Sequence, residues 1–215
     1  MQPLSALALV LLPLSLACRS SFPEREAHLS QPWNARFLPP SSLRTESLLL
    51  EPLNPRHVEL DYAAFMSSRE RLQAEMPFGG WPSEDMSLEE NRADLERHWS
   101  EYEHREAYAY TVLNPEGDDC QGCVYVYPAP AEMLAEHGLP ANVCSVTFWV
   151  DDEALAAGAE EELVRALLDW FERDWPWEGA LFGFTPANER AHALCASLGM
   201  RPIEVPEFDA LYWEP

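Results

Sequence analysis

The chain has 215 residues, of which 47% are hydrophobic, so it is long enough for one ordinary domain with an appendage and apolar enough to bury a core. Fourteen basic residues against 37 acidic ones give a formal net charge of -23, which opposes binding to nucleic acid or to anionic lipid. All fourteen basic residues are arginines, which excludes mechanisms that need a lysine, such as a Schiff base or a P-loop lysine.

Residues 1–17 form an uncharged apolar segment that has the length of a signal peptide and is too short to span a bilayer comfortably. The small residues Ser15 and Ala17 have the spacing that signal peptidase requires, so cleavage would leave Cys18 as the first residue. This arrangement resembles a bacterial lipoprotein leader, in which the cysteine carries lipid. The alternatives are a start assigned too early or a buried N-terminal element. The chain is expected to be exported or membrane-anchored if the leader is real, and cytoplasmic otherwise.

Residues 18–43 are rich in Pro and Ser and show no sustained periodicity, so a linker is expected there. The domain is then expected to occupy residues 44–215. It begins with a short apolar strand at 47–52 and a helix over 54–74 that starts at an Asn-Pro pair. A glycine-containing loop follows at 76–87.

A second helix is predicted from Leu88 onward, because Leu88, Leu95, Trp99 and Tyr102 recur at helical spacing and would form a packing stripe on one face. Two β-rich runs at 107–113 and 121–127 flank a turn-forming cluster and predict a hairpin.

Another strand is expected at 143–150, followed by a helix at 158–173 and a strand at 180–185. The last helix can be capped by Asn188 and stopped by Gly199, and weak strands are expected at 203–205 and 210–213. The fold class predicted from this order is α/β, more narrowly α+β, with a mixed sheet and helices on its faces.

The segment from Asn188 to Met200, NERAHALCASLGM, follows a strand and resembles the last helix of the GNAT family of acyl-CoA-dependent N-acetyltransferases. The element order is similar to that family as well. Likeness covers roughly residues 44–205, and the poorly characterised members that match best share the motifs Asp61-Tyr62, Met66-Ser67-Ser68-Arg69-Glu70, Gly80-Trp81-Pro82, Gly122-Cys123-Val124-Tyr125 and Phe148-Trp149-Val150.

The resemblance implies the acyl-CoA N-acyltransferase fold, in which a mixed central sheet is splayed between the strand ending at Val150 and the one starting near Ala180. Acetyl-CoA would lie in the gap as cosubstrate, and an amine would attack its thioester directly. In the family, backbone N–H groups at a helix N-terminus hold the diphosphate of CoA across a Gln/Arg-x-x-Gly-x-Gly/Ala turn. Here the turn is Glu153 to Gly158. The candidate cofactor-binding residues are Val150, Ala156, Ala157, Gly158, Ala159 and Asn188.

Acidic residues surround this turn, and in the sequence the first arginine beyond it is Arg165. The acids are Asp151, Asp152, Glu153, Glu160, Glu161 and Glu162. Two like charges about 6 Å apart repel by roughly 3 kcal/mol at an effective dielectric constant near 20, whereas a helix terminus contributes only about 0.3 to 1 kcal/mol. Unless the carboxylates point away, weak CoA binding is expected. The alternative is that the glutamates only stabilise the helix dipole.

Cys195 stands where many family members have a tyrosine that protonates the leaving thiolate. A thiol could replace it only if exposed, and packing is the favoured interpretation. A general base could come from Asp151 or Asp152, but no catalytic residue is assigned.

Two minor hypotheses concern the remaining thiols and histidines. Cys120, Cys123, His137 and Cys144 have a composition that could bind zinc, against a favoured interpretation as buried or free thiols with no metal. An exported chain could form a Cys120–Cys123 disulfide. His57, His98 and His104 lie on predicted helices and are expected to be solvated.

The preferred function is therefore transfer of an acyl group from acyl-CoA to an amine of a small molecule or peptide, with a cationic acceptor favoured by the acidic surface. The alternative is a catalytically silent exported protein or lipoprotein that uses the same scaffold for binding. It would contact a membrane only if Cys18 is lipidated. Nucleic acid is not expected as a partner, and the sequence predicts no oligomeric state.

Overall fold

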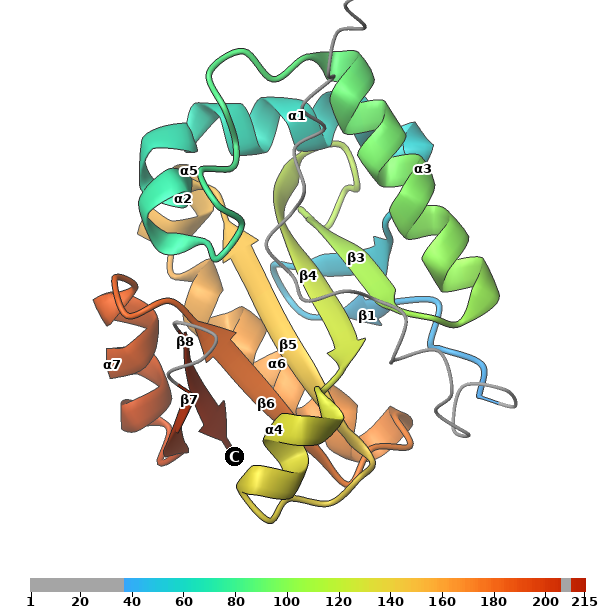
Figure 1. Ribbon diagram of the computed structural model, residues 1–215. Helices are drawn as coiled ribbons and strands as arrows, with labels where there is room; N and C mark the ends of the chain where they lie inside the picture. Colours follow the sequence, from blue (N-terminus) through green and yellow to red (C-terminus); the bar gives the residue numbers. More distant parts are fainter. Residues whose placement is uncertain (1–36, 206–209) are drawn as a thin grey trace, which may run out of the picture.

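The computed structural model describes residues 37–205 and 210–215. The eight strands of these residues form one mixed sheet in the order β1-β2-β3-β4-β5-β6-β8-β7 (Figure 1). The strands are β1 (Leu43–Arg44), β2 (Leu49–Pro52), β3 (Tyr108–Leu113), β4 (Cys120–Pro128), β5 (Val143–Val150), β6 (Gly179–Phe184), β7 (Arg201–Val205) and β8 (Ala210–Glu214). Neighbouring strands are antiparallel except for β5 and β6, which are parallel. The mixed α/β sheet predicted from the element order is confirmed.

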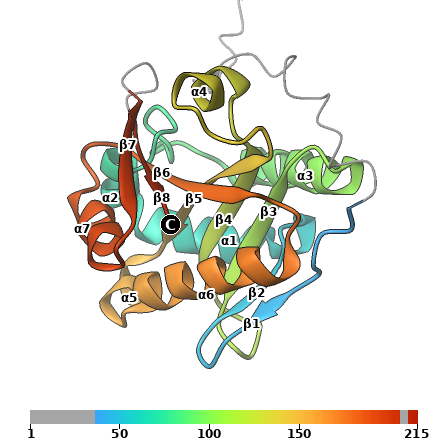
Figure 2. The ribbon, with the colours of Figure 1, turned by 90° about the horizontal axis from the view of Figure 1, so that it is seen from below.

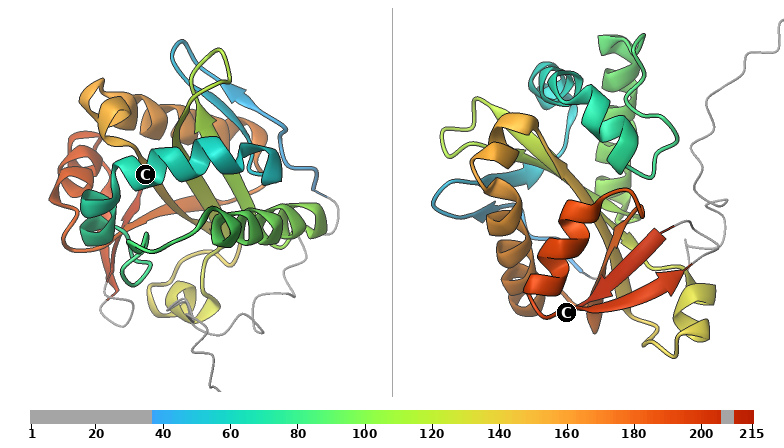
Figure 3. Two further views of the ribbon diagram at one scale, coloured as in Figure 1. Left: turned by 90° about the horizontal axis from the view of Figure 1, so that it is seen from above. Right: turned by 90° about the vertical axis from the view of Figure 1, so that its left-hand side faces the viewer.

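Helices cover both faces of the sheet, as the views in Figures 2 and 3 show. They are α1 (Val58–Ser67), α2 (Arg69–Glu75), α3 (Leu88–His104), α4 (Ala131–Glu136), α5 (Asp152–Ala156), α6 (Ala159–Asp174) and α7 (Glu189–Ser197), with a short 3₁₀ helix, η2 (Pro55–His57), before α1. Helices α6 and α7 lie on one face, and α1, α2 and α3 lie on the other.

Strand alternation explains this two-sided core. On β5, Phe148 packs toward α6 and its neighbour Trp149 packs toward α1, because successive side chains of a strand point to opposite faces. The predicted apolar stripe of α6 is also present, and Leu163, Leu167 and Trp170 are fully buried against the sheet. Both faces of β5 are therefore covered, which fixes the position of the segment that follows it.

The predicted helix over 54–74 is interrupted. Asn54 caps η2 as its Asn-Pro pair suggested, but α1 ends at Ser67 and α2 begins at Arg69. At the break, the hydroxyl of Ser68 accepts a hydrogen bond from the backbone N–H of Asp152, 2.8 Å away, so the break joins this helix pair to the first residue of α5.

The predicted packing stripe of α3 is wrong in part. Leu95 is buried, but Leu88 is 38% exposed and Trp99 is half-buried. The buried positions on this helix include polar residues: Asn91 donates to Asp61 on α1, and His98 and Glu101 pair with each other within α3. We call the buried polar set the α1–α3 cluster: Asp61, Asn91, His98 and Glu101.

Two of the three histidines expected to be solvated are buried. His57 and His98 are each 4% exposed, whereas His104 is exposed as predicted. Burial and the neighbouring Arg56 lower the pKa of His57 to about 4. Burial also opposes the charge on His98, but hydrogen bonds with Asp94 and Glu101 outweigh it and raise its pKa. Asp94 lies four residues before His98 and Glu101 three residues after it, so helical spacing places both partners on the same face of α3.

The packed part of the chain begins before the predicted linker end at residue 43. Phe37 lies against Tyr108 and Trp175, with ring centroids 6.2 and 5.4 Å apart, and β1 pairs with β2. The predicted leader, Cys18 and most of the predicted linker lie outside the described residues. Within the described ranges, no helix has the length and apolarity needed to cross a membrane.

Candidate functional site

The two parallel strands β5 and β6 separate toward their carboxyl ends. Their paired residues run from Val143 opposite Gly179 to Val146 opposite Phe182. Beyond this point β5 continues to Val150 and β6 to Phe184. The splay predicted between these two strands is therefore present, and β5 has unpaired backbone groups along the side that faces β6.

A glycine turn connects the end of β5 to α6. Asp151 caps the short helix α5, and Gly158 then adopts a left-handed conformation with φ of 87° immediately before α6. A Cβ atom at Gly158 would meet no atom within 4 Å, so the turn borders open space. No side chain of the described residues caps α6. The first-turn N–H groups of this 16-residue helix are therefore available to an anion.

Two arginines from distant segments reach this turn. The Nε of Arg71, on α2, lies 2.5 Å from Oδ1 of Asp152, and the Nε of Arg190, on α7, lies 2.8 Å from Oε2 of Glu160. The sequence alone placed no arginine near the turn before Arg165. The structure thus corrects the electrostatic premise of weak CoA binding, because two of the repelling carboxylates have a cation beside them.

Three of the other acids of the turn also have partners. Asp151 accepts a hydrogen bond from a backbone N–H of α5. Glu161 pairs with Arg165 at 2.8 Å on the exposed side of α6, and Glu162 accepts a hydrogen bond from Ser47. These three carboxylates stay near the turn, and each is engaged by a neighbouring donor.

Four charged residues connect the helices around the splay, and we call them the splay cluster: Arg71, Glu75, Glu160 and Arg190. The guanidinium of Arg190 makes four hydrogen bonds of 2.8 to 3.0 Å, two to Glu75 and two to Glu160. Arg71 also binds Glu75, at 2.9 Å. Burial would raise the pKa of Glu75, but its hydrogen bonds to Arg190 and Arg71 lower it, so this carboxylate stays ionised.

Helix α2 bridges the ends of the two separating strands. The Nη2 of Arg71 donates to the carbonyl of Val150 at 2.5 Å, and the hydroxyl of Thr185, just after β6, donates to the carbonyl of Glu75 at 2.8 Å. Figure 1 shows α2 beside the end of β5 and near α5. The carboxyl ends of β5 and β6 are therefore held at a fixed separation by one helix.

The predicted cofactor-binding residues gather around this place. Five of them belong to the end of β5, the turn and the start of α6: Val150, Ala156, Ala157, Gly158 and Ala159. Asn188 is the N-cap of α7 after β6, where its Oδ1 accepts from a backbone N–H at 3.1 Å. The structure thus brings both helix N-termini to the same end of the sheet.

Sequence reasoning missed Arg71, Glu75 and Arg190. One signal was available for Arg190, which lies in the first turn of its helix two residues after Asn188. A cation there opposes the helix dipole, and such a local conflict often marks a position chosen for another reason. The pairing of Arg71 with Asp152 spans 81 positions of the chain, which no local pattern reveals.

Cys195 is fully buried in the core beside α6, which confirms the packing interpretation. Burial, with a contribution from the negative charge of Glu160, raises the pKa of its thiol to about 12. The thiol is therefore not the exposed proton donor that would replace a tyrosine. The two candidate bases are also engaged, Asp151 in the cap of α5 and Asp152 with Arg71.

The zinc hypothesis is wrong for the described residues, which contain no group of three or more side chains placed to bind a metal. Cys123 and Cys144 belong to core clusters on opposite faces of the sheet, and His137 is exposed after α4. Cys120 and Cys123 are both buried free thiols, so the conceivable disulfide is absent between them.

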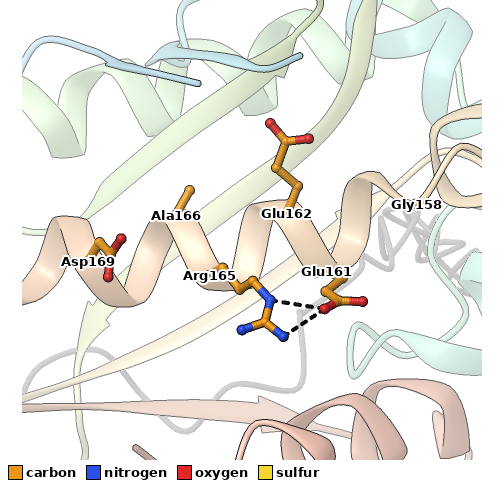
Figure 4. Close-up of a pocket in the computed structure, with 6 residues that line it drawn as sticks. All are labelled: Gly158, Glu161, Glu162, Arg165, Ala166 and Asp169. Atoms are coloured by element: carbon orange, nitrogen blue, oxygen red, sulfur yellow. Dashed lines mark hydrogen bonds and ion pairs between the residues drawn. The ribbon is translucent and has the colours of Figure 1, made fainter. Parts of the chain in front are cut away.

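A shallow depression runs along the outer face of α6 (Figure 4). It has a volume of about 450 Å³ and is lined by Gly158, Glu161, Glu162, Arg165, Ala166 and Asp169. This face is opposite the stripe that packs on the sheet. The depression therefore reaches the glycine turn at one end but lies outside the splay.

A family model for the acetyltransferase (GNAT) domain matches residues 47–201. The chain belongs to the GNAT acetyltransferase family. This confirms the predicted family, fold and enzyme class, an N-acetyltransferase dependent on acetyl-CoA. No curated protein matches the chain by sequence.

Solved GNAT structures share the fold. The ribosomal-protein-S5-alanine acetyltransferase from Vibrio fischeri is 16% identical, with a TM-score of 0.63 over 81% of this chain and 95% of that one. The ribosomal L7/L12 acetyltransferase RimL in complex with CoA is 14% identical, with a TM-score of 0.63 over 80% and 94%. MccE, a microcin C7 self-immunity acetyltransferase in complex with acetyl-CoA and AMP, is 11% identical, with a TM-score of 0.64 over 83% and 97%. None of these comparisons supports the alternative of an exported binding protein.

Proposed function

We propose that this GNAT protein transfers an acetyl group from acetyl-CoA to a primary amine on a cationic small molecule or peptide. The observation that carries the proposal is the uncapped N-terminus of α6, which follows an open glycine turn at the end of the splay. Acetyl-CoA supplies an activated thioester. The chain's own contribution is to bind and orient it.

The backbone at the splay suits each part of such a donor. The N–H groups of Ala159 and Glu160 begin α6 and suit a diphosphate. The side of β5 beyond Val146 that faces β6 has unpaired backbone groups, which suit the amides of a pantetheine arm as a neighbouring strand would. The thioester would then lie between the two strands.

Transfer requires a neutral amine. Its nitrogen attacks the thioester carbonyl carbon, and the carbon–sulfur bond breaks. The nitrogen loses a proton, and the sulfur of the released CoA gains one to become a thiol. Since Cys195 is buried and Asp151 and Asp152 are engaged, we expect positioning to contribute more than acid–base catalysis by a side chain.

A cationic acceptor is favoured by the formal net charge of -23, which raises the local concentration of cations around the molecule. Two of the neighbours named above are acetyltransferases of ribosomal proteins, and the third is an immunity enzyme. The variety of these acetyltransferases supports an amine acceptor, and the proposal includes both small molecules and peptides as acceptors.

Calorimetric titration of the full chain with acetyl-CoA tests the donor. We expect a Kd on the order of 10 to 100 μM, in the range of ordinary enzyme substrates. Thiol release in the presence of a panel of polyamines, aminoglycosides and basic peptides then tests the acceptor. Absence of acetyl-CoA binding at millimolar concentration would contradict the proposal.

Gly158→Ala provides a sharper test. A left-handed alanine costs about 1 kcal/mol of stability and distorts the turn before α6, so acetyl-CoA affinity should fall about tenfold or more. Gly138→Ala is the matched control, because Gly138 also has a positive φ of 65° and open space at its Cβ but follows α4, far from the splay. Equal losses of affinity in the two variants would show that the turn is not the binding element.

A further inference from the structure

Within the splay cluster, Arg190 contacts both carboxylates, Glu75 and Glu160, whereas Arg71 contacts only Glu75. Arg190 is on α7, which follows β6, whereas Glu160 is on α6, which follows β5, so their ion pair spans the two helices that diverge from the splay. Its second partner, Glu75, ends α2 on the other face of the sheet. Arg190 therefore lies beside the first turn of α6, where the diphosphate of the proposed donor would bind.

The chemistry of this position favours an anion other than Glu160. Glu160 and Arg190 each lie in the first turn of a helix, where a negative charge is stabilised and a positive charge is destabilised. A guanidinium fork binds phosphate oxygens with the same two-point geometry that it uses for a carboxylate. Four of its five N–H donors are used by Glu75 and Glu160.

Glu160 is also an obstacle to a bound diphosphate. Its carboxylate is nearly buried, with 8% of the side chain exposed, and it belongs to the same helical turn whose N–H groups suit the anion. The Arg190 side chain is 34% exposed and can reach solvent. The turn from Glu153 to Gly158 contains no basic residue, so a cation beside bound phosphates would have to come from another element.

We propose that Arg190 is a phosphate ligand for CoA and that Glu160 competes with the phosphates for it. The inference rests on the proposed function. On binding, the guanidinium exchanges its hydrogen bonds to Glu160 for hydrogen bonds to phosphate oxygens and keeps those to Glu75. The released Glu160 carboxylate turns to solvent at the N-terminus of α6, where the helix dipole still stabilises it.

Titrations of CoA into the full chain and its variants test the competition, because the two partners should have opposite effects. Arg190→Gln should weaken CoA binding about 10- to 100-fold, the usual value of charged hydrogen bonds. Glu160→Gln should strengthen CoA binding several-fold. Glu161→Gln is the matched control, since it removes the same charge from the next residue, whose side chain faces outward to Arg165, and it should change affinity less than Glu160→Gln.

Parallel titrations with CoA and with dephospho-CoA, which lacks the 3′-phosphate, identify the phosphate that Arg190 binds. If Arg190→Gln weakens CoA and dephospho-CoA equally, the ligand is the diphosphate, and if only CoA is affected, it is the 3′-phosphate. Unchanged affinity in Arg190→Gln overturns the proposal, and so does a Glu160→Gln variant that binds no more tightly than Glu161→Gln. Failure of the unaltered chain to bind CoA would instead contradict the proposed function.

A conservative variant and thermal melting keep the test decisive if Arg190→Gln or Glu160→Gln folds poorly. Arg190→Lys keeps the charge and loses the fork, so it should bind CoA more weakly than the unaltered chain and depend more steeply on salt. Thermal melting without CoA should show that Arg190→Gln and Glu160→Gln destabilise the fold non-additively, because they break one shared pair. Additive destabilisation would contradict the ion pair on which the competition depends.

Discussion

The splay cluster and the α1–α3 cluster are both polar groups that join helices, but Asp61 of the second cluster has a different environment from the two carboxylates of the first. In the splay cluster, Glu75 and Glu160 each face a guanidinium at the edge of solvent. In the α1–α3 cluster, Asp61 is only 3% exposed and accepts a hydrogen bond from the amide of Asn91 at 2.9 Å. Burial raises the pKa of Asp61 to about 7, whereas the pKa of Glu75 is lowered.

The difference separates an exchangeable polar cluster from a structural one. A carboxylate paired with a partly exposed arginine stays charged and can give up its partner to another anion at moderate cost. Burial favours the protonated form of a carboxyl that faces an amide, because the charged form loses its hydration. The first kind suits a binding site, and the second kind fixes how α1 and α3 pack. The predictions below test this division.

The largest effect is expected from His98→Ala. His98 lies 3.2 Å from Glu101 and 3.4 Å from Asp94, so its removal leaves two carboxylates without this partner and opens a cavity. We expect a loss of about 3 kcal/mol in the free energy of unfolding, measured by urea denaturation at pH 7. His104→Ala on the same helix is the control, because His104 is exposed, and it should change stability by less than about 0.5 kcal/mol. Similar losses in both would contradict a structural role for the cluster.

Asp61→Asn should stabilise the protein in a pH-dependent way. In the folded chain the Asp61 carboxyl has a pKa of about 7, against an ordinary value of 3.8. Between these pH values the folded state therefore binds more protons than the unfolded state. Stability therefore falls as pH rises from about 4 to 7, and the shift corresponds to roughly 4 kcal/mol at most. Because the new amide must also be buried, we expect a gain of about 2 kcal/mol at pH 8.

The pH profile distinguishes this cause from better packing. Chemical denaturation of Asp61→Asn and the unaltered chain should give a difference in the free energy of unfolding that shifts in favour of Asp61→Asn between pH 4 and 7 and is nearly constant above that range. A constant difference across that range would show that Asp61 does not titrate near pH 7 in the folded chain.

Local sequence patterns predicted the elements that position the site. The strand at 143–150, the glycine at 158 and the cap at Asn188 are each specified by neighbours in the chain, and all three have the predicted form. Charge balance could not be predicted in the same way. Arg71 meets Asp152 across 81 positions and Arg190 meets Glu160 across 30, so no local pattern assigned a cation to these two acids of the turn.

The same limit applies to the α1–α3 cluster. Helical periodicity marks which positions of α3 share a face, but it assigns apolar residues to the core and polar residues to solvent. Asn91 donates to Asp61 of α1, a contact that forms only once the two helices are packed, whereas His98 has its partners Asp94 and Glu101 on its own helix. The spacing of Asp94, His98 and Glu101 was therefore an available signal for a paired histidine, and the partner of Asn91 was not.

Glu75→Gln tests the exchangeable cluster and should have the smallest effect on stability. The pKa of Glu75 is lowered in the folded chain, so its contribution is present above its ordinary value of 4.5 and is lost as pH falls through the lower folded value. Because Arg190 and Arg71 are partly exposed, we expect a loss of about 1 kcal/mol at pH 7, which shrinks in 1 M salt. Glu84→Gln is the control, since Glu84 is 87% exposed and lies 3.7 Å from Arg69. A salt-independent loss comparable to that of His98→Ala would mean that the splay cluster is as structural as the α1–α3 cluster, and the proposed exchange at Arg190 would then lack its physical basis.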